Sequence, residues 1–121
     1  MSNINNEILN LSPIELLETL SNMYYIELPQ ALITIQDMEN ASTLLLKLSG
    51  DYQYLVTLSS YAKLATREAK RNSSKEAYED MIDKKEMIQN FVEIVKQNYK
   101  ALSRAITVHM ENNEELKMVG G

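Results

Sequence analysis

The fold is decided by residues 30–71, QALITIQDMENASTLLLKLSGDYQYLVTLSSYAKLATREAKR. Apolar residues recur here at separations of three and four, the spacing of one face of an α-helix or coiled coil. Glycine costs a helix about 1 kcal/mol relative to alanine, but the stripe keeps its phase across Gly50. The pattern therefore predicts one continuous or slightly kinked helix, about 60 Å long. The stripe consists of Ala31, Ile35, Met38, Ala41, Leu45, Leu48, Tyr52, Leu55, Leu58, Ala62, Ala65 and Ala69.

A second long helix is predicted after Asn72. Residues 73–76 read Ser-Ser-Lys-Glu, and Ser73 with Glu76 has the spacing of a capping box that starts a helix. A turn this short between two long helices predicts an antiparallel hairpin. The apolar stripe of the second helix is Met81, Ile88, Phe91, Val95, Tyr99, Leu102, Ile106 and Met110.

A shorter helix is predicted before the hairpin. Ser12 can cap it, Pro13 suits its first position, and Glu15 can complete a capping box. Pro29 ends or kinks this helix because the residue before proline avoids the helical region. Its apolar face is Leu16, Leu17, Leu20, Met23 and Tyr24.

The chain of 121 residues has the length of one domain. No stretch has a strand pattern that survives comparison with the helical ones. We therefore expect a single all-α domain over residues 1–121, consisting of a short N-terminal helix and a long antiparallel helical hairpin. Residues 1–11 are rich in Asn and residues 112–121 are polar with two terminal glycines, so both segments are expected to be flexible.

A cluster of four leucines predicts association of the chain. Leu44, Leu45, Leu46 and Leu48 cover about 200° of helical arc, which is more than one partner helix can bury. Either the first helix folds back over this arc, or another subunit covers it. The sequence thus predicts a homo-oligomer.

Composition excludes several classes of function. The chain has no cysteine and one histidine, His109, so disulfides, thiolate zinc sites, cysteine catalysis and multi-histidine metal sites are excluded. The acidic pairs Glu76 with Asp80 and Glu79 with Asp83 are typical of a solvated helix face. No phosphate loop or nucleophile motif is present. We expect no enzyme activity, no metal and no cofactor.

The sequence also predicts a location. No apolar run approaches the roughly 18 residues of a membrane span, and the N-terminus lacks the pattern of a signal peptide. A cytoplasmic protein without membrane contact is expected.

The formal net charge of −5 hides a basic middle. Residues 1–46 contain six acids and no base, for a charge of −6. Residues 47–110 contain eleven bases and eight acids, for +3, and residues 111–121 carry −2. This asymmetry permits anionic partners that the total charge would repel.

Two basic clusters lie in this middle segment, each at helical spacing, with Tyr61 and Tyr99 close to them. Cations that follow a phosphate backbone, with aromatic faces for stacking, are typical of single-stranded nucleic-acid binding. Ordinary solvated helix faces, with the tyrosines in the helix interface, are the alternative. In a hairpin that turns near residue 72, one chain is not expected to join the clusters into a continuous groove, whereas a ring of subunits could. The candidate residues are Lys63, Arg67, Lys70 and Arg71 in the first cluster, and Lys96, Lys100 and Arg104 in the second.

The segment Tyr99–Val108, YKALSRAITV, resembles the last helix of the UvsY-like recombination mediators of tailed phages. Residues 61–70 are also similar to a segment of small phage proteins. The resemblance implies a ring-forming protein that binds single-stranded DNA and helps to load a recombinase past a single-strand-binding protein. On this basis Arg104 would contact phosphates most directly, supported by Lys100 and Lys96. Ala105 departs from the family's pattern, since those mediators usually have glycine there.

The leading hypothesis is therefore a phage recombination mediator or DNA-replication accessory that acts as an oligomer. The alternative is a helical protein-interaction module, such as a phage inhibitor of a host protein or an assembly chaperone, without a nucleic-acid role. Such a module would use the acidic residues 1–46 or the leucine arc.

Overall fold

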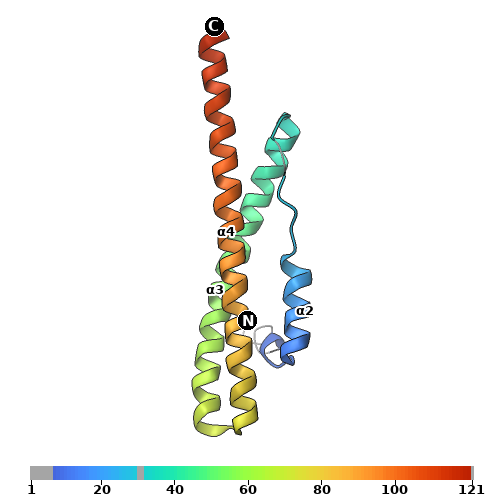
Figure 1. Ribbon diagram of the computed structural model, residues 1–121, viewed down its shortest axis with the longest axis vertical. Coiled ribbons are helices and arrows are strands. Elements are labelled where there is room, and N and C mark those ends of the chain that lie inside the picture. Colours follow the sequence, from blue (N-terminus) through green and yellow to red (C-terminus); the bar gives the residue numbers. More distant parts are fainter. Residues whose placement is uncertain (1–6, 30–31, 121) are drawn as a thin grey trace.

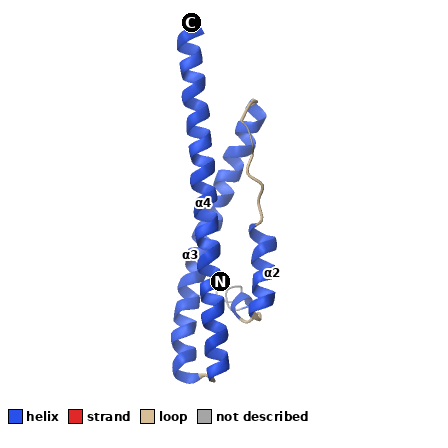
Figure 2. Ribbon diagram, viewed as in Figure 1, coloured by secondary structure: helices blue, strands red, loops and turns tan. Residues whose placement is uncertain are grey.

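The computed structural model describes residues 7–29 and 32–120, with side chains described as far as residue 112. After a helical turn at residues 7–9, helix α2 follows at Pro13–Tyr24. The described part of the chain contains helices and no strand, so the all-α prediction is confirmed (Figure 2). No described helix has both the length and the apolar character needed to cross a membrane.

Two long helices form the predicted hairpin. Helix α3 spans Ile35–Asn72 and helix α4 spans Lys75–Gly120. They lie side by side near the tip of the hairpin and diverge toward its open end (Figure 1). α3 runs without interruption through Gly50, as the phase of its stripe predicts. α4 continues beyond Met110 to Gly120, so the polar sequence after Met110 does not end the helix.

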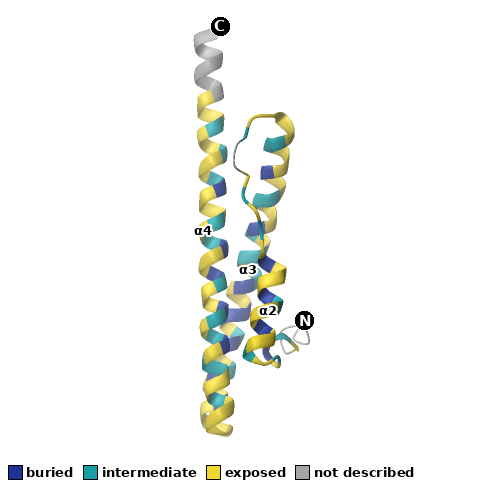
Figure 3. Cartoon of the chain, turned by 45° about the vertical axis from the view of Figure 1, so that its right-hand side comes forward, coloured by how far each residue is buried: buried dark blue, intermediate teal, exposed yellow. Residues whose placement is uncertain are grey.

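The hairpin core follows a seven-residue repeat. Side chains at this spacing pack in the manner of a coiled coil, and the buried residues lie where the helices turn toward one another (Figure 3). The predicted stripes are thus confirmed along the paired part of the hairpin. Near the open end Ile35 is 81% exposed, because the helices have diverged there. The buried repeat is Ala41, Leu48, Leu55, Ala62 and Ala69 in α3, and Ile88, Val95 and Leu102 in α4.

A lysine fills the gap in the α4 stripe. Lys84 lies between Met81 and Ile88 and is only 8% exposed. Its Nζ donates a hydrogen bond of 2.7 Å to the backbone carbonyl of Leu9, which is itself buried. The burial of Leu9 and this hydrogen bond join residues 7–11 to α4. Residues 1–6 lie outside the described residues, and the expected flexibility of the N-terminal segment stays a prediction.

Helix α2 folds back along the hairpin and packs mainly against α4. Leu16 and Leu20 are fully buried, and the ring of Tyr24 lies 6.3 Å from that of Phe91, measured between centroids. The predicted cap is present, with the Glu15 amide donating to Ser12 Oγ at 3.2 Å. The Glu15 carboxylate accepts from the Ser12 hydroxyl rather than from a backbone amide.

The leucine arc is only partly covered by this fold-back. Leu48 is buried, and Leu44 and Leu45 are half-buried. Leu46 remains 77% exposed. Helix α2 therefore does not satisfy the whole arc.

The connector between α2 and α3 differs from the prediction. α2 ends at Tyr24, and residues 25–29 alternate between exposed and half-buried, with Ile26 and Leu28 packed against the core. Such alternation is typical of extended chain, because successive side chains point to opposite sides. The helix expected from residue 30 begins instead at Ile35. Gln30 and Ala31 lie outside the described residues.

The start of α3 is set by an unpredicted capping box. Thr34 Oγ1 accepts a hydrogen bond of 3.0 Å from the Asp37 amide. Asp37 Oδ2 in turn accepts 3.0 Å bonds from the amides of Ile33 and Thr34. These bonds satisfy amides that a helix N-terminus leaves without partners, which explains why the helix begins here.

The cap of α4 lies one residue later than predicted. Ser74 Oγ accepts from the Ala77 amide at 3.2 Å, so Ser74 rather than Ser73 caps the helix. Ser73 instead ends α3, and its amide donates to the Ala69 carbonyl at 3.0 Å. The turn between the helices is thus shared between two adjacent serines, one for each helix end.

The substitution Gly50→Ala should stabilise the protein. Gly50 lies inside α3 with a negative φ, and a Cβ added there would meet nothing within 4 Å. Alanine is favoured over glycine in a helix interior by about 0.5–1 kcal/mol. Urea denaturation should show this gain in the free energy of unfolding with an unchanged m-value. A loss of stability would contradict a continuous α3.

The capping carboxylate gives the fold a dependence on acid pH. Hydrogen bonds from the amides of Thr34 and Ile33 favour the ionised form of Asp37 and lower its pKa below the ordinary value. Its stabilising effect is therefore present above the pKa of the unfolded chain and is lost as pH falls through the lower folded pKa. A carboxyl titration of Asp37 by NMR should show this depressed value. Titration at the ordinary pKa of about 3.9 would contradict the cap.

Candidate nucleic-acid interface

A basic hollow lies between α3 and α4 near the tip of the hairpin. We call it the tip pocket. Its volume is about 350 Å³. The α3 side chains of the pocket lie on one face of the helix. Thr66 joins this face to α4, because its hydroxyl donates a hydrogen bond of 3.4 Å to the Met81 carbonyl. No carboxylate is among the described residues that line it. Its lining residues are Lys63, Thr66, Arg67 and Lys70 of α3, and Tyr78 and Lys85 of α4.

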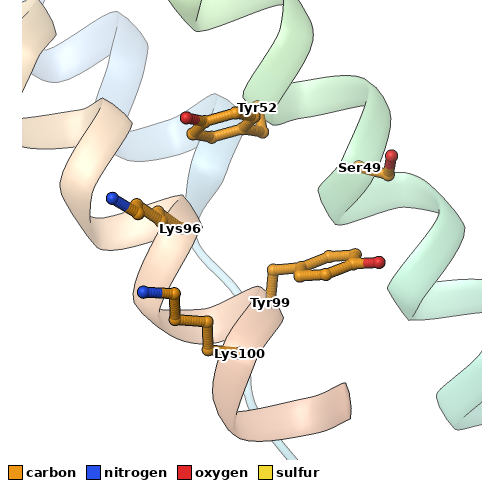
Figure 4. A pocket seen from close by; sticks show the side chains of 5 residues that line it. All are labelled: Ser49, Tyr52, Lys96, Tyr99 and Lys100. Atoms are coloured by element: carbon orange, nitrogen blue, oxygen red, sulfur yellow. The ribbon is translucent and has the colours of Figure 1, made fainter.

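A second hollow lies farther from the tip, and we call it the tyrosine pocket. Its volume is about 290 Å³. Ser49 and Tyr52 contribute to it from α3, and Lys96, Tyr99 and Lys100 from α4 (Figure 4). In the close-up the Tyr52 ring lies higher than the Tyr99 ring and is displaced sideways from it, with the two hydroxyls pointing in opposite directions. Both lysine side chains extend to the side toward which Tyr52 points.

Both pockets lie on one side of the hairpin. Tyr52 and Lys63 are eleven residues apart in α3, and Lys85 and Lys96 are eleven apart in α4. Eleven residues make about three helical turns, so each pair shares a face and is separated by about 16 Å along the axis. The two pockets therefore lie along the same side of the hairpin, and we call this side, with both pockets, the open groove.

A polar contact bridges the helices between the two pockets. Ser59 Oγ donates to Gln89 Oε1 at 3.1 Å. Ser59 is buried, so this bond joins α3 to α4 beneath the surface, at a position between the two pockets.

Helix α2 covers the opposite side of α4. Lys84 bonds the N-terminal segment and Phe91 contacts Tyr24, whereas Lys85 lies about 100° around the helix from Lys84. The fold-back of α2 thus covers one side of the hairpin and leaves the open groove accessible.

The first predicted cluster is largely brought together. Lys63, Arg67 and Lys70 line the tip pocket. Arg71 lines a different hollow, shared with Leu64, Glu68 and Asn72, to which Arg67 also contributes. Sequence reasoning missed Tyr78 and Lys85, which α4 adds to the pocket.

The second predicted cluster is divided. Lys96 and Lys100 line the tyrosine pocket. Arg104 lines a separate hollow that includes Pro29 and Leu32 of the connector. An i,i+4 series turns by about 40° at each step, so the stripe leaves the groove before residue 104.

The predicted tyrosines also separate. Tyr99 lines the tyrosine pocket, as the hypothesis of stacking requires. Tyr61 is half-buried and packs against the core instead. The sequence pattern places Tyr52 in the apolar stripe. Its separation of eleven residues from Lys63, about three helical turns, is the signal that could have placed it on the face of the first basic cluster.

The cations of the open groove have no acidic partner among the described side chains. Ion pairs in this part of the chain join Lys47 to Asp51 at 2.6 Å and Lys75 to Glu79 at 4.0 Å. Neither pair involves a side chain of the two pockets. The described side chains that line the two pockets therefore carry positive charge and no negative charge, which favours an anionic ligand.

Tyrosines with perturbed titration lie elsewhere. Burial raises the pKa of Tyr24 well above its ordinary value, with further contributions from Tyr54 and Asp51. Burial likewise raises the pKa of Tyr54, whose hydroxyl is buried without a hydrogen-bond partner. These groups belong to the side that faces α2, so their perturbation reflects packing rather than the groove. No group of three metal-ligating side chains occurs among the described residues.

Comparison with family models, curated proteins and solved structures yields no match for this chain. The resemblance to UvsY-like mediators stays a prediction, and the geometry of the open groove is the basis for interpreting the site.

Proposed function

We propose that the protein binds single-stranded nucleic acid, DNA above all, along the open groove, as a non-enzymatic accessory protein. One observation carries the proposal: cations from two distant sequence clusters lie on the same accessible side of the hairpin with aromatic side chains, and no described carboxylate pairs with them. Such a surface combines the phosphate contacts and stacking faces of single-strand binding. The cations are Lys63, Arg67, Lys70, Lys85, Lys96 and Lys100.

The spacing of the pockets suits a short stretch of strand. Stacked nucleotides rise by about 3.4 Å each, so the separation of about 16 Å corresponds to about five nucleotides. One chain would therefore contact a short segment, and continuous coverage of a longer strand requires several chains.

The exposed apolar surface supports such an assembly. The accessible surface of the chain is 8564 Å², whereas a compact monomer of 13.9 kDa has about 6,700 Å². The excess of about 1,900 Å² exceeds the roughly 800 Å² per partner of a standard interface. We propose a homo-oligomer, for which Ile33, Ile35 and Leu46, each more than three-quarters exposed, are the strongest contact candidates.

A role in loading a recombinase extends this proposal. It is supported by the resemblance of residues 99–108 to the mediators, and it requires binding of both single-stranded DNA and a recombinase. Arg104 lies outside the groove, although the resemblance to the mediators implies that this side chain contacts phosphates most directly. At this residue the structure and the resemblance therefore differ.

Fluorescence anisotropy with labelled oligonucleotides tests the binding proposal. About five phosphate contacts predict a slope near −3.5 for the logarithm of the binding constant against that of salt concentration. Raising salt from 50 to 200 mM should then weaken binding about 100-fold. A folded protein that binds no oligonucleotide at low salt would refute the proposal, and binding independent of salt would exclude phosphate contacts.

A protein-interaction module is the second candidate. It is favoured by the exposure of Ile33, Ile35 and Leu46 near the acidic N-terminal third. A pull-down from nuclease-treated lysate separates the two functions. If the protein binds oligonucleotides as proposed, the pull-down should recover only a recombinase or further copies of this chain in stoichiometric amounts. Another stoichiometric protein partner would favour the interaction module.

A further inference from the structure

The tyrosine pocket has walls from both long helices. Tyr52 projects from α3 and Tyr99 from α4, and both line the same cavity (Figure 4). Tyr99 is 38% exposed, so its ring is accessible from solvent. Lys96 and Lys100 lie one turn apart beside the rings, at the spacing of two cations that can meet the same strand.

The register of the hairpin sets the offset between the rings. Thr66 bonds the Met81 carbonyl, and Ser59 bonds Gln89. Extending this antiparallel register away from the tip places Tyr52 opposite residues 95–96 and Tyr99 opposite residues 48–49. The backbone positions of the two tyrosines are therefore offset by three to four residues, or about 5–6 Å along the groove.

That offset approaches the space needed by one planar base. Stacked bases are separated by about 3.4 Å, so a base between two rings requires about 7 Å between them. The cavity of about 290 Å³ lies at the lower end of the volumes of about 300–1,000 Å³ found for small-molecule sites. The pocket is thus suited to a single aromatic ring system rather than to a larger ligand.

We propose that the tyrosine pocket binds one unpaired nucleobase between Tyr52 and Tyr99, while Lys96 and Lys100 hold the adjoining phosphates. This inference rests on the proposed function. It adds a chemical reason why the protein would bind single strands in preference to duplex. A base inside a duplex is stacked on both faces and paired along one edge, so it cannot enter the pocket without being extruded. The described lining of the tip pocket includes one aromatic ring, that of Tyr78, so we assign this pocket to phosphate contacts.

The first test compares two oligonucleotides with the same number of phosphates. One is a labelled thymidine oligonucleotide of about ten nucleotides, and the other is its abasic counterpart. Stacking of one base predicts that wild-type protein binds the thymidine strand about 5- to 100-fold more tightly. Equal affinity for the two strands would overturn the base pocket while leaving the proposed function standing. Absence of binding to both, even at low salt, would refute the proposed function itself.

The second test removes the rings. The double variant Tyr52→Leu/Tyr99→Leu should bind the thymidine strand only as well as the abasic strand, with an unchanged salt dependence. The matched control is Tyr25→Leu, because Tyr25 is exposed and lies in the connector, bonded to Glu27 at 3.0 Å. The same loss in the control would overturn the assignment.

Tyr52 also packs against the core, so a measurement on wild-type protein complements the variants. An oligonucleotide carrying 5-iodouracil should crosslink under ultraviolet light to Tyr52 or Tyr99, identified by mass spectrometry of the peptides. Crosslinks confined to residues outside the tyrosine pocket would overturn the inference.

Discussion

Replacing four groove lysines by glutamine should weaken binding of single-stranded DNA by more than about 100-fold at 50 mM salt. The variant is Lys63→Gln, Lys70→Gln, Lys96→Gln and Lys100→Gln, two residues from each pocket. Each lost phosphate contact should also reduce the slope of the logarithm of the binding constant against that of salt concentration by about 0.7. The four substitutions together should reduce this slope by nearly three. The fold should persist, because these side chains form no ion pair with a described residue.

The matched control removes the same charge elsewhere. It combines Lys47→Gln, Arg71→Gln, Lys75→Gln and Arg104→Gln, none of which lies in either pocket. Both variants have the same net charge, so the long-range attraction between protein and DNA changes equally in the two. Only the groove variant loses the proposed phosphate contacts. Anisotropy titrations at several salt concentrations should therefore separate them. A comparable loss in the control would show that the DNA follows another surface, and Arg104, which the resemblance favours, would then be examined first.

Lys84 and Lys85 are adjacent cations of α4, but neither can serve as a control substitution that leaves both the fold and the groove unchanged. Lys84 is a core residue that holds the N-terminal segment, and Lys85 is part of the tip pocket. Their difference arises from a rotation of about 100° between successive residues. Sequence charge alone does not distinguish a lysine that binds a ligand from one that binds a backbone carbonyl.

The hairpin could be predicted because its packing repeats along the chain. Leu48, Leu55 and Ala62 are seven residues apart, and the repetition identifies the buried face without knowledge of the partner helix. The connector could not be predicted equally well. Its apolar residues also fit a helical continuation, and the capping bonds of Thr34 and Asp37 determine where α3 starts.

The site was predictable residue by residue but not in its arrangement. Helical spacing identifies side chains that share a face of one helix, yet the register of the hairpin determines which faces of α3 and α4 meet. That register places Tyr52 beside Lys96 and adds Lys85 to the first cluster. The expectation that a single chain keeps the clusters apart is thus revised: they remain about 16 Å apart, but they lie in the same groove.

Accessibility of the groove follows from where the chain places its apolar contacts. α2 buries Leu16 and Leu20 on one side of the hairpin, and an extended connector returns the chain to the open end. If α2 lay on the other side, it would cover the tyrosine and tip pockets. The position of the N-terminal third therefore leaves the groove open to the proposed ligand, although this part of the chain is acidic.

The substitution Leu55→Ala should lower the free energy of unfolding by about 2–5 kcal/mol. Leu55 is fully buried at the centre of the α3 repeat, between the two pockets in sequence, so its loss removes apolar contacts and leaves a cavity. Since small domains are stable by about 5–15 kcal/mol in total, a large part of the stability would be lost. Urea denaturation at several protein concentrations measures the effect.

The matched control at an exposed leucine distinguishes fold from assembly. Leu46 lies on the same helix but is 77% exposed, so Leu46→Ala should change the stability of a monomer by no more than about 0.5 kcal/mol. If subunits associate through this side chain, wild-type stability rises with protein concentration, and Leu46→Ala should reduce that rise. Leu55→Ala should instead destabilise the protein at every concentration. Equal losses in both variants at all concentrations would mean that Leu46 is buried within the subunit, contrary to the structure.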